Sequence, residues 1–442
     1  MKSAGVDDDT TLLLGLDGVV VDRVELDPDG CRVVHLATAE REAVCPSCRT
    51  ASAAPRGWTV TRPRDVAWPT RSRLVWRKRR WRCRAAGCGR GSFTESVPAL
   101  PPRARVTARL KTAAGRAVAA GGRTIAQAAR DHGLSWPTVS AAFAREAGLL
   151  LPDAPEPVTT LGIDETRRGR PRYGVDPETG ATTVTADRWH TGFVDLTGGH
   201  GLLGQTEGRA AADAGAWLAA QPPSWRAGVR VVAIDMCPAY RAAVRTHLPN
   251  ATLVVDHFHV VQLANQTVSA VRRRVTATLR GRRVRASDPE YGIRRRLLRN
   301  REDLTGTQFA DMWNRLIDLG APGEQILSAW IAKEELRALL ALARTDPARH
   351  TISARLWAFY HWCADTSLPE LHRLAATIET WWPQIEAFLH TGITNAASEG
   401  VNRLIKLEAR NAYGFRNPTN QRLRSRCASR RKAWRQTQPA QP

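Results

Sequence analysis

The chain has 442 residues, 43% of them hydrophobic, which is enough apolar material for several packed cores and excludes a disordered chain. Its 65 Lys and Arg residues outnumber its 42 Asp and Glu residues and give a formal net charge of +23. All but six of these cations are Arg, whose planar guanidinium binds phosphate through two hydrogen bonds. Chemistry on acidic small molecules alone does not require this excess, so the composition favours a polyanionic partner.

Cysteine content and hydropathy indicate the cellular compartment of the protein. Eight Cys in a chain of this length are too few for a disulfide scaffold and suit a reducing environment. The sequence begins without a basic region followed by an apolar run, and no stretch has the length needed to span a bilayer. We therefore expect a cytoplasmic, nucleoid-associated protein that contacts no membrane.

Composition and periodicity predict a multidomain α/β protein. Its six expected segments are, in chain order, a β-rich unit at 1–102, an Ala-rich helical segment with a Pro-rich linker at 103–157, an α/β segment at 158–265, an all-helical insertion or appended subdomain at 266–390, a final helix with a basic tail at 391–435, and a disordered end at 436–442.

Two pairs of cysteines in the first segment have the spacing of zinc ligands. Cys45 and Cys48 form a C-x2-C pair, and Cys83 and Cys88 form a C-x4-C pair. Four thiolates on two tight turns can hold Zn²⁺ in tetrahedral geometry and stabilise a unit whose core is small. The alternative is four unconnected cysteines in an Arg-rich loop. We expect a structural zinc ribbon.

A basic run between the cysteine pairs is a candidate DNA contact. Its cations alternate with Trp76 and Trp81, so that one face could contact phosphates while the other packs. The alternative is a charged strand that faces only solvent. The expected DNA contacts in this run are Arg77, Lys78, Arg79, Arg80 and Arg82.

Residues 124–140 have the spacing of a helix-turn-helix. Ala129 lets two helices approach, Gly133 takes the turn and Val139 anchors the second helix. Ser135 is expected to cap that helix. An Ala-rich helical hairpin without a DNA-binding role can mimic the pattern. The residues expected to face DNA are Ser135, Thr138, Ser140 and Arg145.

Four acidic residues lie where apolar runs end or where a helix begins. Asp164, Asp235 and Asp256 each follow a strand-like run, and Glu399 follows helix-capping residues. Neighbouring strands would bring such carboxylates to one sheet edge, where like charges must be neutralised by protons or metal. Taken singly, each acid could instead cap a helix or solvate a strand end. One predicted helical face holds Glu399, Asn402 and Lys406.

The order of these motifs resembles the bacterial insertion-sequence transposases of the IS-L-three (ISL3) family. The resemblance covers nearly the whole chain and rests on the ribbon, the helix-turn-helix and the runs GIDE, DMCPAY, DHFH, TNAASEGVNRLIK and AYGFR. It implies an RNase H-like catalytic domain with an all-helical insertion and a DDE triad of Asp164, Asp235 and Glu399. One departure is the segment 168–183, which is longer and richer in Pro and Gly than the compact hairpin expected there.

The same resemblance implies partners and activity. Family members cut DNA at terminal inverted repeats and join the ends to target DNA, so double-stranded DNA is the expected partner and a homodimer on DNA the expected assembly. The two rival functions are a non-catalytic DNA-binding regulator, such as a domesticated relic, and a structure-specific RNase H-like nuclease. The three acids argue against the first, and the sequence-reading N-terminal modules argue against the second.

Phosphodiester chemistry explains why three acids would be needed. Two Mg²⁺ ions held by carboxylates activate an oxygen nucleophile and stabilise the departing 3′ oxygen. Hard oxygen ligands select Mg²⁺ or Mn²⁺ over Zn²⁺. Asp256 could replace Asp235 as the second ligand, although we favour Asp235, and Glu165 is expected to point to the opposite face. The expected supporting residues are Asp256, His257, His259, Asn402 and Lys406.

Two further features have alternative interpretations. Trp381 and Trp382 could stack on an unpaired base, but aromatic residues in a helical segment are more often part of a core. The runs 271–301 and 403–435 are rich in Arg and could contact DNA or only solvent. The second run contributes the expected DNA contacts Arg403, Arg410 and Arg416.

Overall fold

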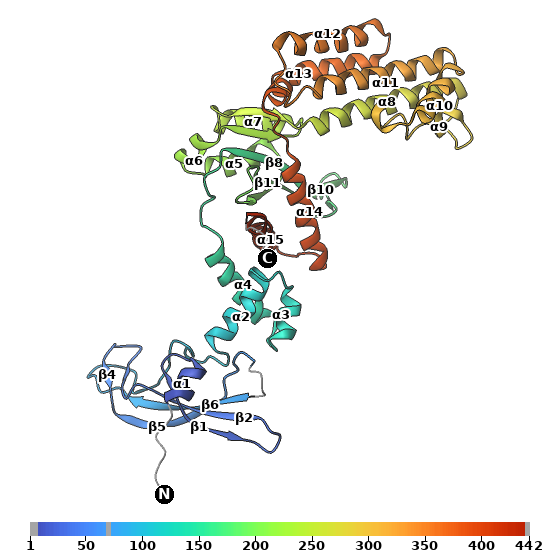
Figure 1. Ribbon diagram of the computed structural model, residues 1–442. Helices are drawn as coiled ribbons and strands as arrows, with labels where there is room; N and C mark the ends of the chain where they lie inside the picture. Colours follow the sequence, from blue (N-terminus) through green and yellow to red (C-terminus); the bar gives the residue numbers. More distant parts are fainter. Residues whose placement is uncertain (1–7, 68–71, 438–442) are drawn as a thin grey trace. The chain divides into compact units, whose positions relative to one another are not determined.

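The computed structural model describes residues 8–67 and 72–437, which form two compact units (Figure 1). The first unit contains the described residues up to Asp153 together with Asn411–Ala428, and the second contains Ala154–Arg410 and the residues from Ser429 onward. Segment 391–435 is therefore divided between the units. No helix within the described ranges is long and apolar enough to cross a membrane.

The chain end expected to be disordered lies mostly outside the described residues. Gln436 and Thr437 are the last residues of the final helix, α15 (Pro418–Thr437), and 438–442 are not described.

A five-stranded sheet forms the N-terminal part of the first unit. The strand order is β1-β2-β6-β5, with β7 beside β6, and only β2 and β6 are parallel. Leu36 and Trp76 fill the core on one face of the sheet. The elements are α1 (Asp8–Leu14), β1 (Val19–Leu26), β2 (Arg32–Thr38), β5 (Pro55–Thr61), β6 (Ser72–Arg82) and β7 (Ser92–Thr94), with β3 (Ala43–Val44) and β4 (Ala51–Ser52) as a separate hairpin.

Three helices and the start of α15 complete the first unit. They are α2 (Ala108–Ala119), α3 (Ile125–Asp131) and α4 (Trp136–Leu150). Leu110, Val139 and Phe143 from these helices form one buried cluster with Cys427 of α15. Residues 411–428 thus belong to the core of the helix-turn-helix, although they follow it in the chain by more than 250 positions.

A second five-stranded sheet forms the centre of the second unit. Its strands are β8 (Thr160–Arg167), β11 (Trp189–Asp195), β12 (Leu202–Glu207), β13 (Val231–Ile234) and β14 (Thr252–Val255), in the order β12-β11-β8-β13-β14. The first three are antiparallel, whereas β8, β13 and β14 are parallel. The flanking helices are α5 (Ala211–Ala219), α6 (Pro223–Gly228) and α7 (Pro238–His247).

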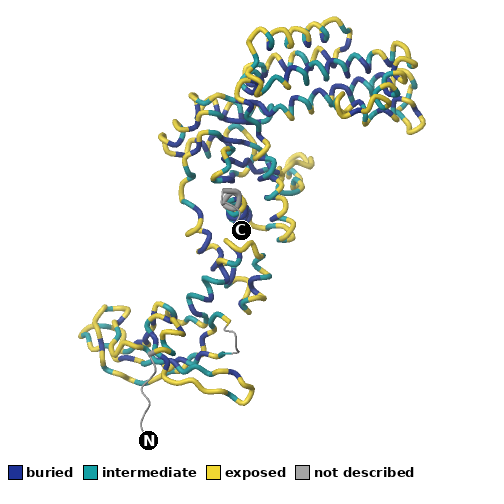
Figure 2. Tube along the Cα trace, viewed as in Figure 1, coloured by how far each residue is buried: buried dark blue, intermediate teal, exposed yellow. Residues whose placement is uncertain are grey.

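The segment that departs from the expected family pattern is a two-stranded hairpin. β9 (Arg172–Val175) and β10 (Thr182–Ala186) pair only with each other. Figure 2 draws almost all of this hairpin as exposed, with every residue of β10 in that class. The Pro- and Gly-rich insertion therefore extends away from the sheet rather than adding to it.

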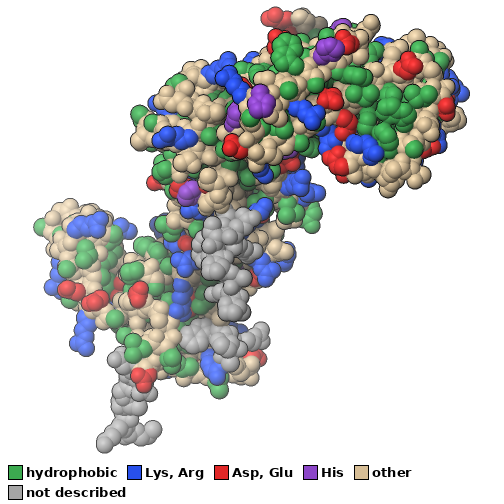
Figure 3. Space-filling model, turned by 45° about the horizontal axis from the view of Figure 1, so that its top comes forward, with side chains coloured by type: hydrophobic (Ala, Val, Ile, Leu, Met, Phe, Trp, Pro, Cys, Tyr) green, Lys and Arg blue, Asp and Glu red, His purple; other side chains and the backbone are tan. Residues whose placement is uncertain are grey.

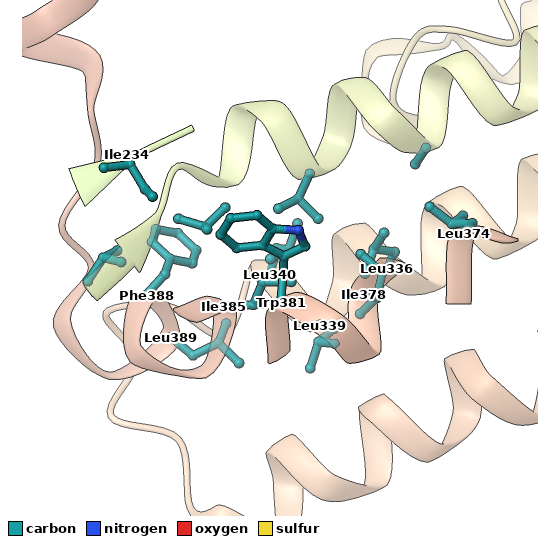
Figure 4. Packing of buried hydrophobic residues seen from close by; sticks show 14 of the residues in the cluster. Ile234, Leu336, Leu339, Leu340, Leu374, Ile378, Trp381, Ile385, Phe388 and Leu389 are labelled. Atoms are coloured by element: carbon teal, nitrogen blue, oxygen red, sulfur yellow. The ribbon is translucent and has the colours of Figure 1, made fainter. Parts of the chain in front are cut away.

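The helical segment continues directly from the sheet, because α8 begins two residues after β14 ends. Its elements are α8 (His257–Arg280), α9 (Pro289–Gly292), a 3-10 turn at Arg301–Asp303, α10 (Gly306–Ile317), α11 (Ala321–Leu340), α12 (Arg349–Asp365) and α13 (Pro369–Thr391), followed by α14 (Ala396–Asn411). Figure 4 shows Trp381 among Leu340, Ile385 and Phe388, and its exposed fraction is 4%. Trp381 is therefore a core residue and not a base-stacking one.

Acidic side chains pair with some of the Arg residues in the run 271–301. Arg274 pairs with Glu370, Arg280 with Glu290, and Arg282 with Asp288. Figure 3 shows Asp and Glu side chains beside Lys and Arg side chains on the helical part. These cations stabilise the helical fold, so their number alone does not indicate a DNA contact.

Candidate active site and DNA-binding elements

Three carboxylates converge at the edge of the second sheet. Ile163 of β8 pairs with Ile234 of β13, so the residues that follow them, Asp164 and Asp235, lie side by side. Oxygen atoms of Asp164, Asp235 and Glu165 all lie within 4.8 Å of one another. We expected Glu165 to point to the opposite face, but its longer side chain reaches the same edge.

The environment of Asp164 disfavours its charged form. Burial raises the pKa of Asp164 to about 7, and the neighbouring carboxylate of Asp235 acts in the same direction. Like charges brought together in this way are stabilised by a proton or by a bound cation. The arrangement is therefore suited to a divalent metal with oxygen ligands.

A side-chain amide of helix α14 forms a hydrogen bond with Asp164. Nδ2 of Asn402 donates a hydrogen bond of 2.7 Å to Oδ2 of Asp164. The hydroxyl of Thr166 donates to Oδ1 of the same amide, which fixes its orientation. Asn395, just before α14, donates from Nδ2 to the carbonyl of Ile163 at 3.1 Å.

A glycine in β8 permits this close approach. A Cβ atom added to Gly162 would overlap Oγ of Ser398 and would lie 2.6 Å from Oδ1 of Asn395. Only glycine leaves room for α14 at that position. Sequence reasoning missed Gly162, Asn395 and Thr166, although the glycine two residues before Asp164 was the available signal.

Glu399 is on the helix that binds Asp164 but is not one of the converging acids. It is on α14, three residues before Asn402, and its side chain is 36% exposed. One of its oxygens lies 3.6 Å from Arg403. Lys406, expected on the same face, is exposed, whereas Asn402 is buried against β8. The predicted shared face therefore separates into a buried part and an exposed part.

Asp256 caps a helix. One oxygen accepts a hydrogen bond from the backbone N–H of Phe258 at 3.1 Å, in the first turn of α8. The other accepts from the backbone N–H of Asn395 at 3.2 Å. The Asp256 side chain is buried, and both oxygens are used by the backbone. Asp256 thus joins the start of α8 to the start of α14.

The two histidines of the DHFH run have different neighbours. Nε2 of His259 lies 3.0 Å from Oδ1 of Asp235, and this contact raises the pKa of His259. The ring of His257 stacks on Phe388 with a centroid distance of 4.9 Å, and its Nδ1 lies 3.3 Å from Asp256. His259 therefore contacts an acid of the site, whereas His257 packs on Phe388.

The four cysteines of the first unit form one cluster. Sulfur atoms of Cys45, Cys48, Cys83 and Cys88 lie within 4.8 Å of one another. The sulfurs of Cys48 and Cys83 are 3.5 Å apart, close to the roughly 3.8 Å expected for two thiolates on one tetrahedral zinc ion. Hydrogen bonding by Thr50 lowers the pKa of Cys48 to about 6, whereas burial and the neighbouring thiols raise the pKa of Cys83 to about 12, so the four thiols cannot all ionise without a bound cation.

Comparison with known proteins identifies the family. A transposase sequence model of the ISL3 family, of the DDE type, matches residues 161–425, which is more than half of the chain. A second model, described as the helix-turn-helix domain of transposase family ISL3, matches residues 95–147. The chain belongs to the ISL3 family of transposases. The expected family is thus confirmed.

Individual relatives agree with this family. The transposase for insertion sequence element IS1001 of Bordetella parapertussis is 27% identical over 416 residues, which cover 91% of this chain and 93% of that protein. The transposase for IS1557 of Mycobacterium tuberculosis is 28% identical over 246 residues, 52% of this chain and 54% of that protein. The Drosophila P element transposase strand transfer complex matches 73% of this chain and 91% of its own at 10% identity, with a TM-score of 0.37, which is too low to establish a shared fold.

The helix-turn-helix of this ISL3 transposase has the predicted local geometry. Gly133 takes the turn with φ of +57°, and the hydroxyl of Ser135 accepts a hydrogen bond from the backbone N–H of Thr138 at the start of α4. Ser140 is partly exposed on the same helix. Arg145 is 57% exposed and also pairs with the buried Glu146. All four residues expected to face DNA are at least partly exposed, and their contact with DNA stays a prediction.

The basic strand of the transposase ribbon is divided between its two faces. Lys78 is only 5% exposed and lies over the Trp76 ring. The guanidinium of Arg79 pairs with the buried Glu95 at 3.0 Å. Alternation along β6 places Lys78 on the same face as Trp76 and Arg79 on the opposite face with Trp81, and both side chains stabilise the sheet by packing on these rings. The exposed members of the predicted set are Arg77, Arg80 and Arg82.

Proposed function

We propose that this transposase binds the terminal inverted repeats of its insertion sequence, cuts the DNA there and joins the ends to target DNA through Asp164, Asp235 and Glu399. One observation carries the proposal: Asp164 and Asp235 converge where β8 meets β13, and Asn402 binds Asp164 from α14. Glu399 lies one helical turn from Asn402, within reach of the same edge.

The strand order supports an RNase H-like catalytic domain. Three antiparallel strands are followed by two parallel ones, with Asp164 on β8 and Asp235 directly after β13. The helices α8 to α13 then form an insertion between β14 and the helix of the third acid. This is the arrangement that the family resemblance implies.

The acids fit Mg²⁺ or Mn²⁺, because the converging ligands are all carboxylate oxygens. A divalent cation bound there supplies activation of the attacking oxygen and stabilisation of the departing 3′ oxygen. Asp164 and Asp235 would hold it, with Asn402 and His259 fixing their orientation. Glu399 would be the third ligand, and its partly exposed side chain now lies near Arg403.

The cysteine cluster fits a structural Zn²⁺ ion. All four ligands are thiols, and no described histidine or carboxylate belongs to the cluster. Such a closed set holds zinc for stability and not for catalysis. The ribbon with Arg77, Arg80 and Arg82, and the helix-turn-helix with Ser135, Thr138, Ser140 and Arg145, would contact the duplex. Two element ends require two active sites, which supports a homodimer on DNA.

The experiment is a cleavage and joining assay with Mg²⁺ on a labelled duplex that carries the inverted repeat flanking the coding sequence. Asp164→Asn, Asp235→Asn and Glu399→Gln are expected to bind this duplex but neither nick nor join it. Glu165→Gln is expected to retain measurable nicking, because the proposed triad does not include it. Glu379→Gln, an exposed acid on α13, is the matched control and should act as wild type.

Any other outcome supports one of the alternative functions or a different ligand set. Wild type that binds the repeat but neither nicks nor joins in Mg²⁺ or Mn²⁺ indicates a DNA-binding regulator. Nicking without joining indicates a nuclease. If Glu165→Gln abolishes nicking and Glu399→Gln does not, Glu165 is the third ligand and the proposed triad is wrong.

A further inference from the structure

A pocket of about 510 Å³ lies within the first unit, between the helix-turn-helix and the segment 411–424. Helices α3 and α4 line one side, and the turn after α14 with the start of α15 lines the other. Pockets of this size commonly hold an organic group. Its position next to the first turn of α4 is important, because the start of a recognition helix is the part that meets base edges.

The lining of this pocket is aromatic and cationic. It includes Trp136 and Tyr413, together with Arg130 and Arg416, and none of its described residues is Asp or Glu. Trp136 is 51% exposed and Tyr413 fully exposed. Aromatic rings with nearby guanidinium groups and no carboxylate suit a nucleotide, because its base can stack and its phosphate is attracted.

The backbone holds Tyr413 in this exposed position. Its φ of +52° lies in the left-handed region, which a bulky residue rarely adopts, and Gly414 follows with φ of +93°. The adjoining chain is anchored, since the Arg424 guanidinium donates to the carbonyl of Arg123 at 2.9 Å and Cys427 is buried in the core. A strained, anchored turn that exposes an aromatic ring is a pattern found at binding sites.

We propose that residues 411–417 are a second DNA-contacting element of the helix-turn-helix unit, and that the pocket holds a nucleotide beside the base pairs read by α4. Trp136 and Tyr413 contact its base or sugar, and Arg130 and Arg416 lie near its phosphates. This inference rests on the proposed function, because the DNA concerned is the terminal inverted repeat.

The test measures binding of the full chain to a fluorescent duplex carrying the inverted repeat, without added Mg²⁺ or Mn²⁺ so that the DNA is not cut. Tyr413→Ala and Trp136→Ala are expected to raise Kd for this duplex by roughly 5- to 100-fold. Tyr413→Phe, which keeps the ring, should bind the duplex with a Kd close to that of wild type. Arg416→Ala should reduce the slope of log Kd against log salt by about 0.9, because one phosphate is no longer neutralised. A hydroxyl-radical footprint of Tyr413→Ala should shrink at one edge only.

Trp357→Ala is the matched control, because Trp357 is also highly exposed (71%) but lies on α12 in the other unit. Circular dichroism checks that each variant folds. If Tyr413→Ala and Trp136→Ala keep the wild-type Kd and footprint while wild type still distinguishes the repeat from a scrambled duplex, the pocket inference is wrong and the proposed function stands. If wild type binds the repeat and the scrambled duplex equally well, the proposed recognition of the inverted repeat is wrong.

Discussion

Nδ2 of Asn402 donates a 2.7 Å hydrogen bond to Oδ2 of Asp164, although the two residues are 238 positions apart in the chain. The whole helical segment lies between them in sequence. The amide also accepts from Thr166, so its donor end points toward the Asp164 carboxylate and the carbonyl of Glu165. The orientation of Asp164 thus depends on correct docking of α14 against β8.

Replacing Asn402 with alanine should therefore impair the site without unfolding the protein. Loss of a group that orients a metal ligand typically costs 10- to 100-fold in metal affinity or activity. We expect Asn402→Ala to weaken Mn²⁺ binding by about this factor, measured by the electron paramagnetic resonance signal of free Mn²⁺, and to slow nicking similarly. Asn314→Ala, an exposed asparagine on α10, is the control. Unchanged Mn²⁺ affinity in Asn402→Ala would show that the hydrogen bond has no such role.

Docking of α14 also depends on Gly162. Because an added Cβ would meet the side chains of Ser398 and Asn395 at 2.6 Å or less, Gly162→Ala must displace these side chains, including the Asn395 amide that donates to Ile163. Overpacking of this kind typically costs about 1–3 kcal/mol. We expect a lower Tm and slower nicking, whereas Gly228→Ala, where a Cβ would meet no atom within 4 Å, should leave both unchanged. A wild-type Tm for Gly162→Ala would contradict close packing of α14 against β8 at this position.

Parts of this arrangement could be predicted from the sequence because their causes are local. The turn at Gly133, the cap at Ser135 and the cysteine spacing each involve residues close in the chain. Parallel neighbours account for the convergence of Asp164 and Asp235, since parallel strands end at the same edge. A local pattern was sufficient for the turn, the cap and the cysteine pairs, whereas the convergence of the two acids also required β8 and β13 to pair.

The features that were missed depend on packing between distant segments. Alternation puts Lys78 on the same strand face as Trp76, but the burial of its side chain depends on how that face of the sheet is covered. The amides of Asn395 and Asn402 find their partners only after α14 has returned to β8. The addition of residues 411–428 to the helix-turn-helix core likewise joins segments that no local periodicity connects.

The structure allows the role of Asp256 to be tested separately from catalysis. Both oxygens accept backbone N–H groups, one at α8 and one at Asn395. Asp256→Ala is expected to lower the free energy of unfolding by about 0.5–2 kcal/mol, as for the loss of other helix caps. Asp256→Asn keeps one acceptor and should be less destabilising, with nicking retained. If Asp256→Asn keeps the wild-type Tm but loses all nicking, Asp256 is a metal ligand instead.

Zinc removal should affect the ribbon and leave the sheet of the second unit folded. We expect one Zn²⁺ per chain by elemental analysis, and its loss in Cys48→Ser, because three thiolates no longer close the tetrahedral site. Limited proteolysis should then cut within the ribbon first. Cys31→Ser is the control, since Cys31 lies outside the cluster. Equal zinc content in wild type and Cys48→Ser would contradict a four-cysteine site.

Acid should destabilise the helical segment through its ion pairs. Hydrogen bonds from Arg282 hold the pKa of Asp288 well below its ordinary value, and those from Arg280 lower the pKa of Glu290. A carboxylate whose pKa is lower in the folded state stabilises the fold above its unfolded pKa, about 4 for these residues, and loses this effect as pH falls through the folded value. Tm should therefore fall progressively below about pH 4. In Asp288→Asn and Glu290→Gln the fall in Tm should be shallower, because fewer protons are taken up on unfolding. Glu178→Gln is the control and should follow wild type, because Glu178 is an exposed acid in the β9–β10 hairpin. Identical Tm-against-pH curves for all four proteins would show that these ion pairs contribute no net stability.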